Sequence, residues 1–218
     1  MYIISFDCGI KNFAYSCIQL NNNINVNNVN NDSIDSFFDN NKYNIISINN
    51  VNLHTVKSDN HILEEKTKKK TKKTGNCINL HNHVVALLLN TVSNLNINEN
   101  IKILIEYQMN INHKANIIYN IIITFFETYY KINNKQNYEI ITVQPAYKNN
   151  IAQKIDSDDK IRIKYVNQYA YNKKIVTMYF LSLNTKYNFI DTKQFKKMDD
   201  ISDSFIQILS YLLYYYKI

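Results

Sequence analysis

Two short apolar strands in this sequence each end on an acidic side chain. "YIISF" (2–6) runs directly into Asp7 and is then broken by Gly9, and "IKILIEYQ" (101–108) carries Glu106 near its end. Burying a carboxylate at such a position is costly unless a partner compensates for the lost water. One interpretation is a pair of turns, because Asp and Gly favour turns. The other is that both acids belong to one site at the strand ends.

The order of the predicted elements indicates an α/β fold. Three consecutive strands can form a meander, and each later strand follows a helix, which implies parallel pairing. We therefore expect a mixed five-stranded sheet flanked by helices, in which the first and fourth strands can lie side by side. The strands are expected at 2–6, 13–20, 43–53, 101–108 and 138–145. The helices are expected at 83–95, 113–132, 146–155, 168–183 and 199–216.

The length of the chain suits one domain with a well-developed core. It has 218 residues, 45% of them hydrophobic, and we expect a single domain over 1–218. Polar, Lys-rich sequence at about 54–76 is expected to form an exposed, mobile insertion. The net charge is +7, but six lysines lie in "KTKKKTKK" (66–73), so the rest of the chain is nearly neutral. Attraction to a polyanion would come from this segment and from patches that the fold assembles.

A third acidic group begins the last predicted helix. In "KKMDDISDSF", Asp200 and Asp203 are three residues apart and lie on one helical face, while Asp199 is expected to cap the helix. Taken alone, these acids are explained by their favourable interaction with the helix dipole.

The three acidic segments together favour a metal site. Carboxylates repel one another unless a cation lies between them, and Mg²⁺ prefers such oxygen ligands. Four converging carboxylates can bind two divalent ions about 3.5–4 Å apart, an arrangement used for in-line phosphodiester cleavage.

These segments resemble the motifs of a known family. "SFDCGIKNFAYS", "IEYQ" and "KKMDDISDSF" are similar, in the same order, to motifs of Holliday junction resolvases of the RuvC-like superfamily, especially the poxvirus resolvases and their fungal mitochondrial relatives. The similarity extends in pieces from residue 1 to about 212. It implies an RNase H-like fold and Mg²⁺-dependent homodimers that make paired cuts in four-way DNA junctions.

The resemblance also implies roles for individual side chains. The family's four acids fall on Asp7, Glu106, Asp200 and Asp203, which would be catalytic and would hold two Mg²⁺ ions, or Mn²⁺ in their place.

The family also has a catalytic or phosphate-contacting lysine. "YNKKIVTMYFLSL" (171–183) resembles a basic helix start of RuvC-like enzymes, which favours Lys173 and Lys174, with Lys174 as the catalytic candidate and Lys148 as the next choice. DNA contacts are expected from Lys11, Lys148, Lys173 and Lys174.

Other functions share some of these sequence features. An RNase H-type ribonuclease for RNA–DNA hybrids shares the metal chemistry, and a non-catalytic DNA-binding relative would share the fold. An actin-like or sugar-kinase ATPase needs several glycine-rich phosphate loops, which Gly9 and Gly75 cannot supply. Cys77, His81 and His83 lack a fourth zinc ligand at a familiar spacing.

The expected partners are branched DNA and a second copy of the chain, with no membrane. A single arginine, Arg162, leaves few bidentate contacts to guanine, so we expect recognition of DNA structure instead of base sequence. The helix 113–132 is our expected dimer interface, through Ile117, Ile121, Phe125 and Tyr129. No targeting pattern is present and the three cysteines form no Cys-x-x-Cys pair, so we expect the cytoplasm, or the host cytoplasm if the protein is viral.

Overall fold

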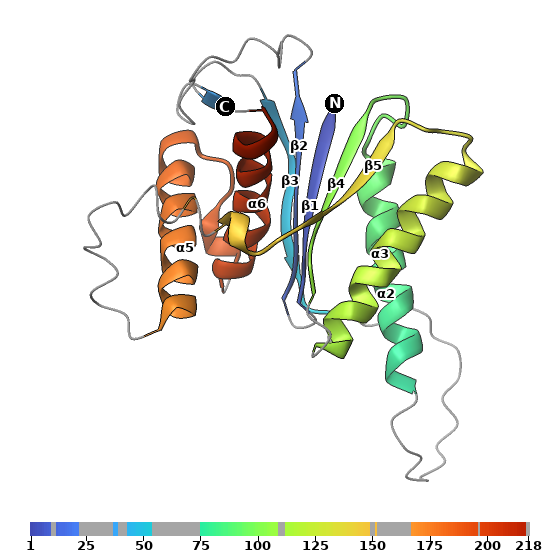
Figure 1. Cartoon of the computed structure of the whole chain (residues 1–218), viewed down its shortest axis with the longest axis horizontal. Helices are drawn as coiled ribbons and strands as arrows, with labels where there is room; N and C mark the ends of the chain where they lie inside the picture. Colours follow the sequence, from blue (N-terminus) through green and yellow to red (C-terminus); the bar gives the residue numbers. More distant parts are fainter. Residues whose placement is uncertain are drawn as a thin grey trace.

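One mixed sheet lies at the centre of the described structure (Figure 1). The computed structural model describes residues 1–9, 12–21, 37–38, 43–53, 75–108, 112–148, 151, 167–195 and 197–216. Within these residues the sheet has five strands in the order β3-β2-β1-β4-β5. The strands are β1 (Tyr2–Cys8), β2 (Phe13–Leu20), β3 (Tyr43–Val51), β4 (Ile101–Glu106) and β5 (Tyr138–Val143).

The strand pairing confirms the predicted mixed sheet. β1 pairs antiparallel with β2, and β2 pairs antiparallel with β3, as expected for a meander. β1 and β5 both pair parallel with β4. In the β1–β4 pair Phe6 lies opposite Ile105, so Asp7 and Glu106 directly follow paired positions at the same edge of the sheet.

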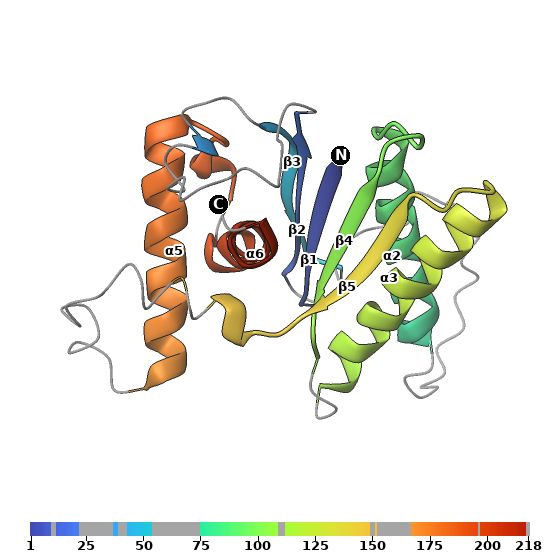
Figure 2. The same ribbon diagram turned by 45° about the horizontal axis from the view of Figure 1, so that its top comes forward.

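Helices cover both faces of the sheet (Figures 1 and 2). One face carries α2 (Gly75–Ser93) and α3 (His113–Ile132), and the other carries α5 (Gln168–Tyr187) and α6 (Asp199–Tyr216). A short 3₁₀ helix, η3 (Thr192–Gln194), lies between α5 and α6 in the sequence. None of the helices described here is both long and apolar enough to cross a bilayer.

The pleat of the strands decides which face each acid points to. Side chains alternate between the two faces of a strand. Ile3 of β1 and Leu104 of β4 belong to the core formed with α5 and α6. Asp7 and Glu106 lie an even number of residues further along, so their side chains lie on the α5–α6 face. Phe6 belongs to the opposite core, with α2 and α3.

The element order agrees with the sequence prediction, and the bounds differ in places. β4 and β5 each end two residues earlier than predicted, and β1 continues to Cys8. The helix predicted at 83–95 begins at Gly75, because Leu80 already packs against the core one turn before Val84. Most of the predicted insertion and of the helix 146–155 lies outside the described residues, although 146–148 and 151 are helical.

A pair of leucine substitutions tests the packing of α6 on the sheet. Leu209 of α6 is buried in the α5–α6 core, whereas Leu89 of α2 is 48% exposed. We predict that Leu209→Ala lowers the free energy of unfolding by about 2–5 kcal/mol, because it leaves a cavity. Leu89→Ala should change it by no more than about 0.5 kcal/mol. Urea unfolding checks both values, and equal losses would contradict the packing described here.

Candidate functional site

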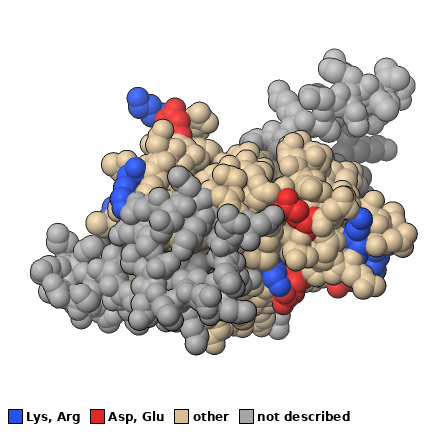
Figure 3. Space-filling view, turned by 90° about the horizontal axis from the view of Figure 1, so that it is seen from above, with Lys and Arg blue, Asp and Glu red and all other residues tan. Residues whose placement is uncertain are grey.

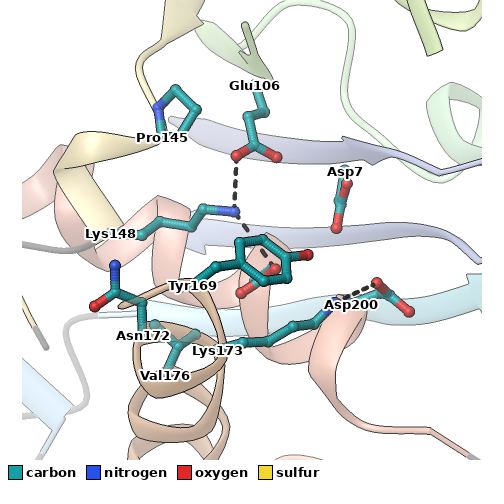
Figure 4. Close-up of a pocket in the computed structure, with 10 residues that line it drawn as sticks. Asp7, Glu106, Pro145, Lys148, Tyr169, Asn172, Lys173, Val176 and Asp200 are labelled. Atoms are coloured by element: carbon teal, nitrogen blue, oxygen red, sulfur yellow. Dashed lines mark hydrogen bonds and ion pairs between the residues drawn. The ribbon is translucent and has the colours of Figure 1, made fainter. Parts of the chain in front are cut away.

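The four predicted acids line one pocket at the edge of the sheet. Asp7 and Glu106 come from the ends of β1 and β4, and Asp200 and Asp203 come from the start of α6. Figure 4 shows Asp7, Glu106 and Asp200 around this pocket, with α5 on its other side. The remaining residues that line it are Pro145, Lys148, Tyr169, Asn172, Lys173 and Val176.

The packing of α6 brings its two acids to the strand ends. The helix lies against β1, β2 and α5, and Ile201 and Phe205 are buried in the core between them. A hydrogen bond of 2.7 Å joins the buried hydroxyls of Ser204 on α6 and Ser16 on β2. These contacts fix the rotation of α6, so Asp200 and Asp203 face the pocket.

Lys148 forms ion pairs with two of the four acids. Its Nζ lies 3.0 Å from Glu106 Oε1 and 3.6 Å from Asp203 Oδ2, and only 9% of its side chain is exposed. Burial alone would lower the pKa of Lys148, but the carboxylates of Asp203, Glu106 and Asp7 raise it above its usual range. Lys148 is therefore a charged ammonium inside the acidic cluster.

The pKa values of two of the acids stay raised in spite of this lysine. Burial raises the pKa of Asp7 well above its usual range; Lys148 opposes the shift and the nearby Glu106, Asp203 and Asp200 add to it. The pKa of Asp203 is also raised, again first by burial, with Lys148 opposing. Further positive charge at this pocket would stabilise the ionised acids.

A second group of ion pairs surrounds the first turn of α6. Lys173 Nζ lies 2.8 Å from Asp199 Oδ2 and 3.4 Å from Asp200 Oδ1. Lys197 Nζ lies 2.7 Å from Asp199 Oδ2 and 3.8 Å from Asp200 Oδ2. The prediction that Asp199 caps the helix is wrong: Asp199 is already helical, and the carbonyl oxygen of Met198 accepts the bond from Ser202 N. The carboxylate of Asp199 pairs instead with Lys173 and Lys197.

The other predicted lysines lie apart from the acids or outside the described residues. Lys174 lies on the exposed side of α5 and is absent from the residues that line the pocket, whereas its neighbour Lys173 is among them. Lys11 lies outside the described residues. The sequence alone ranked Lys148 below Lys174, yet a signal was present. β5 pairs parallel with β4, so residues just after β5 emerge beside Glu106.

The donor set fits a hard divalent cation. Mg²⁺ prefers oxygen ligands, and four carboxylates around one pocket supply them. Asp200 Oδ2 is buried and accepts no hydrogen bond from the described groups. As the described side chains stand, no three His, Cys, Asp or Glu residues are spaced to hold one ion. The ammonium of Lys148 lies between two of the acids.

Known proteins resemble this chain in structure and not in sequence. No family model and no curated protein matches its sequence. Among solved structures, the Fowlpox virus resolvase in complex with substrate Holliday junction DNA is 20% identical, with 99% of both chains covered and a TM-score of 0.58. The fowlpox virus Holliday junction resolvase is 19% identical, with 99% of both chains covered and a TM-score of 0.53. The yeast mitochondrial Holliday junction resolvase Ydc2 is 15% identical. The match covers 99% of this chain and 84% of that chain, with a TM-score of 0.51.

The chain has the RNase H-like fold of the poxvirus resolvases. This finding confirms the predicted fold class and the structural resemblance over the whole chain. At these identities the likeness establishes the fold and not the activity.

The raised pKa of Asp7 predicts a pH-dependent stability. The native state holds this proton more tightly than the unfolded state, whose Asp pKa is about 3.9. The resulting stabilisation is present below that pH and is lost as the pH rises through the native pKa. Asn cannot ionise, so Asp7→Asn does not lose stability in this way. The free energy of unfolding of Asp7→Asn relative to the wild type should therefore increase with pH. Urea unfolding in EDTA from acidic to neutral pH measures the difference.

The matched control for this prediction is Asp191→Asn. Asp191 is an exposed cap of η3, and asparagine can accept the same hydrogen bond from the backbone of Lys193. Its stability should follow the wild type at every pH. A pH-independent difference between Asp7→Asn and the wild type would contradict the shifted pKa.

Proposed function

We propose that this chain is a divalent-metal-dependent Holliday junction resolvase, an endonuclease that makes paired nicks in four-way DNA junctions during viral DNA replication or recombination. The observation that supports this best is the convergence of Asp7, Glu106, Asp200 and Asp203 on one pocket. The fold is that of structures solved as Holliday junction resolvases, one of them with junction DNA. A DNA-binding relative without catalysis would not need all four acids.

The four acids would hold the metal, which we expect to be two Mg²⁺ ions or Mn²⁺ in their place. When bound, the metal supplies Lewis-acid stabilisation of the charge that develops at the phosphate. The protein contributes the position of the ligands. Asp7 and Glu106 are fixed by paired strands, and Asp200 and Asp203 by a buried helix. This rigidity preorganises the site for the transition state.

The lysines of the pocket would bind the DNA backbone. Lys148 and Lys173 line the pocket from the segment after β5 and from α5, and both remain charged because nearby acids raise their pKa. We assign the catalytic or phosphate-contacting role to Lys148 in preference to Lys174, because Lys148 lies among the acids. On the face seen in Figure 3, the basic side chains of the described residues form small separate groups. Dispersed lysines suit phosphate contacts without base readout.

Cleavage of three substrates in parallel tests this proposal. In Mg²⁺ we expect symmetric nicks near the crossover of a four-way DNA junction, with a matched linear duplex and an RNA–DNA hybrid nearly uncut. Two acidic centres spaced for diverging strands cannot both reach a linear duplex. Asp203→Asn should lower the rate by at least about 100-fold while DNA binding persists. Denaturing gels of end-labelled strands measure the cuts, and gel shifts measure binding.

Two outcomes would contradict this proposal. Preferential cutting of the RNA strand of the hybrid would favour an RNase H-type ribonuclease. Full activity of Asp203→Asn would remove this acid from the mechanism. Asp191→Asn is the control for an Asp-to-Asn change on the surface, and its rate should equal that of the wild type.

Paired nicks require two acidic centres, so we propose a homodimer. A groove between α2 and α3 is lined by three of the predicted interface residues, Ile121, Phe125 and Tyr129, and by Ile132, which is 73% exposed. We propose that α3 forms part of the dimer interface. We also propose that the protein acts in the cytoplasm, or in the host cytoplasm if it is viral.

Light scattering tests the dimer. The wild type should have twice the mass of one chain, and Ile132→Asp should shift it toward the monomer because a charge enters the apolar groove. Leu89→Asp on α2 is the control, because Leu89 is exposed and does not line the groove. A wild type that is monomeric at working concentration and still makes paired cuts would contradict the proposal.

A further inference from the structure

The position of Lys148 bears on how a metal ion can enter the pocket. Its ammonium forms ion pairs with both Glu106 and Asp203, which reach it from β4 and from α6. Figure 4 shows the side chain extending across the pocket to Glu106. Lys148 itself comes from a third element, the short helical segment after Pro145. One cation therefore joins acids from two separate parts of the fold.

Three lysines in or beside the pocket pair with different acids. Lys173 and Lys197 pair with Asp199 and Asp200, whereas Lys148 pairs with Glu106 and Asp203. Lys148 is also the most buried of the three, at 9% against 24% for Lys173 and 55% for Lys197. An ammonium that has lost its water depends on these carboxylates, and the carboxylates depend on it.

A divalent ion would need the same oxygens. Mg²⁺ lies about 2.0–2.1 Å from its ligand oxygens. The Lys148 Nζ already lies 3.0 Å from Glu106 Oε1, so an ion bound to that oxygen would lie within a few ångströms of a second positive charge. At such a separation the repulsion between the two cations is severe.

We propose that Lys148 is a built-in counterion of Glu106 and Asp203. A divalent metal must displace its ammonium before these acids can coordinate the metal. This inference rests on the proposed function only in taking these acids as metal ligands. In the metal-free protein Lys148 offsets part of the negative charge of this pair and links β4 to α6. Metal binding then breaks two ion pairs, which lowers the affinity for the metal until DNA phosphates offer the displaced ammonium a new partner.

Metal binding without DNA tests the inference. Lys148→Met keeps the apolar stem and removes the charge, and it should tighten Mn²⁺ binding by at least about tenfold, a change of about 1.4 kcal/mol. Electron paramagnetic resonance of free Mn²⁺ measures the affinity directly. Lys102→Met is the matched control, because Lys102 pairs with Glu139 at the other end of β4. The affinity of this variant for Mn²⁺ should equal that of the wild type.

Lys173→Met separates displacement from a general loss of positive charge. Lys173 lines the same pocket but pairs with Asp199 and Asp200, so its removal should tighten Mn²⁺ binding less than Lys148→Met does. Equal gains in the two variants would overturn the inference, because pocket charge alone would then explain them. Unchanged or weaker binding by Lys148→Met would also overturn it.

A measurement on the wild-type chain does not depend on the folding of any variant. Reductive methylation labels free amines, and mass spectrometry reports the labelling of Lys148. Saturating Mg²⁺ should increase this labelling, because the displaced ammonium leaves its ion pairs. Unchanged labelling at a metal concentration that saturates the wild type would overturn the inference.

The two proposals fail in different ways. If the junction is cut in Mg²⁺ but the labelling of Lys148 is the same with and without metal, only the displacement is wrong. If Lys148→Met binds Mn²⁺ more tightly but no DNA is cut, the displacement stands and the proposed function fails.

Discussion

The parallel pairing of β1 with β4 is the interaction on which the rest of the structure depends. Parallel strands end at the same edge of a sheet, and here the register places Phe6 opposite Ile105. The next residue of each strand is an acid that the pleat turns to the same face. Had the two strands run antiparallel, Asp7 and Glu106 would lie at opposite edges, and α6 could meet only one of them.

This arrangement concentrates negative charge where water is scarce, and the fold compensates for it locally. Lys148 lies among the acids, and Lys173 and Lys197 bind the first turn of α6. The compensation is incomplete, because the pKa values of Asp7 and Asp203 stay raised. Sites that bind cations often carry such residual strain, since a fully neutralised pocket would have nothing left to attract a metal.

The acids could be predicted from local sequence patterns, whereas the lysine that lies among them could not be singled out from the other candidates. Asp7 and Glu106 interrupt apolar strands, and Asp200 and Asp203 share a helical spacing, so local patterns reveal them. A lysine gives no such signal in a chain that has 25 lysines and arginines. The place of Lys148 beside Glu106 depends on the pairing of β5 with β4, which is a property of the sheet.

The chain order of the four acids has a consequence for synthesis on the ribosome. Asp7 and Glu106 belong to the first half of the chain, but Asp200 and Asp203 arrive with α6, which also fills the space against β1 and β2. A nascent chain that has made the first four strands therefore carries half of the site and an uncovered sheet face. The complete acidic pocket can form only after α6 has left the ribosome.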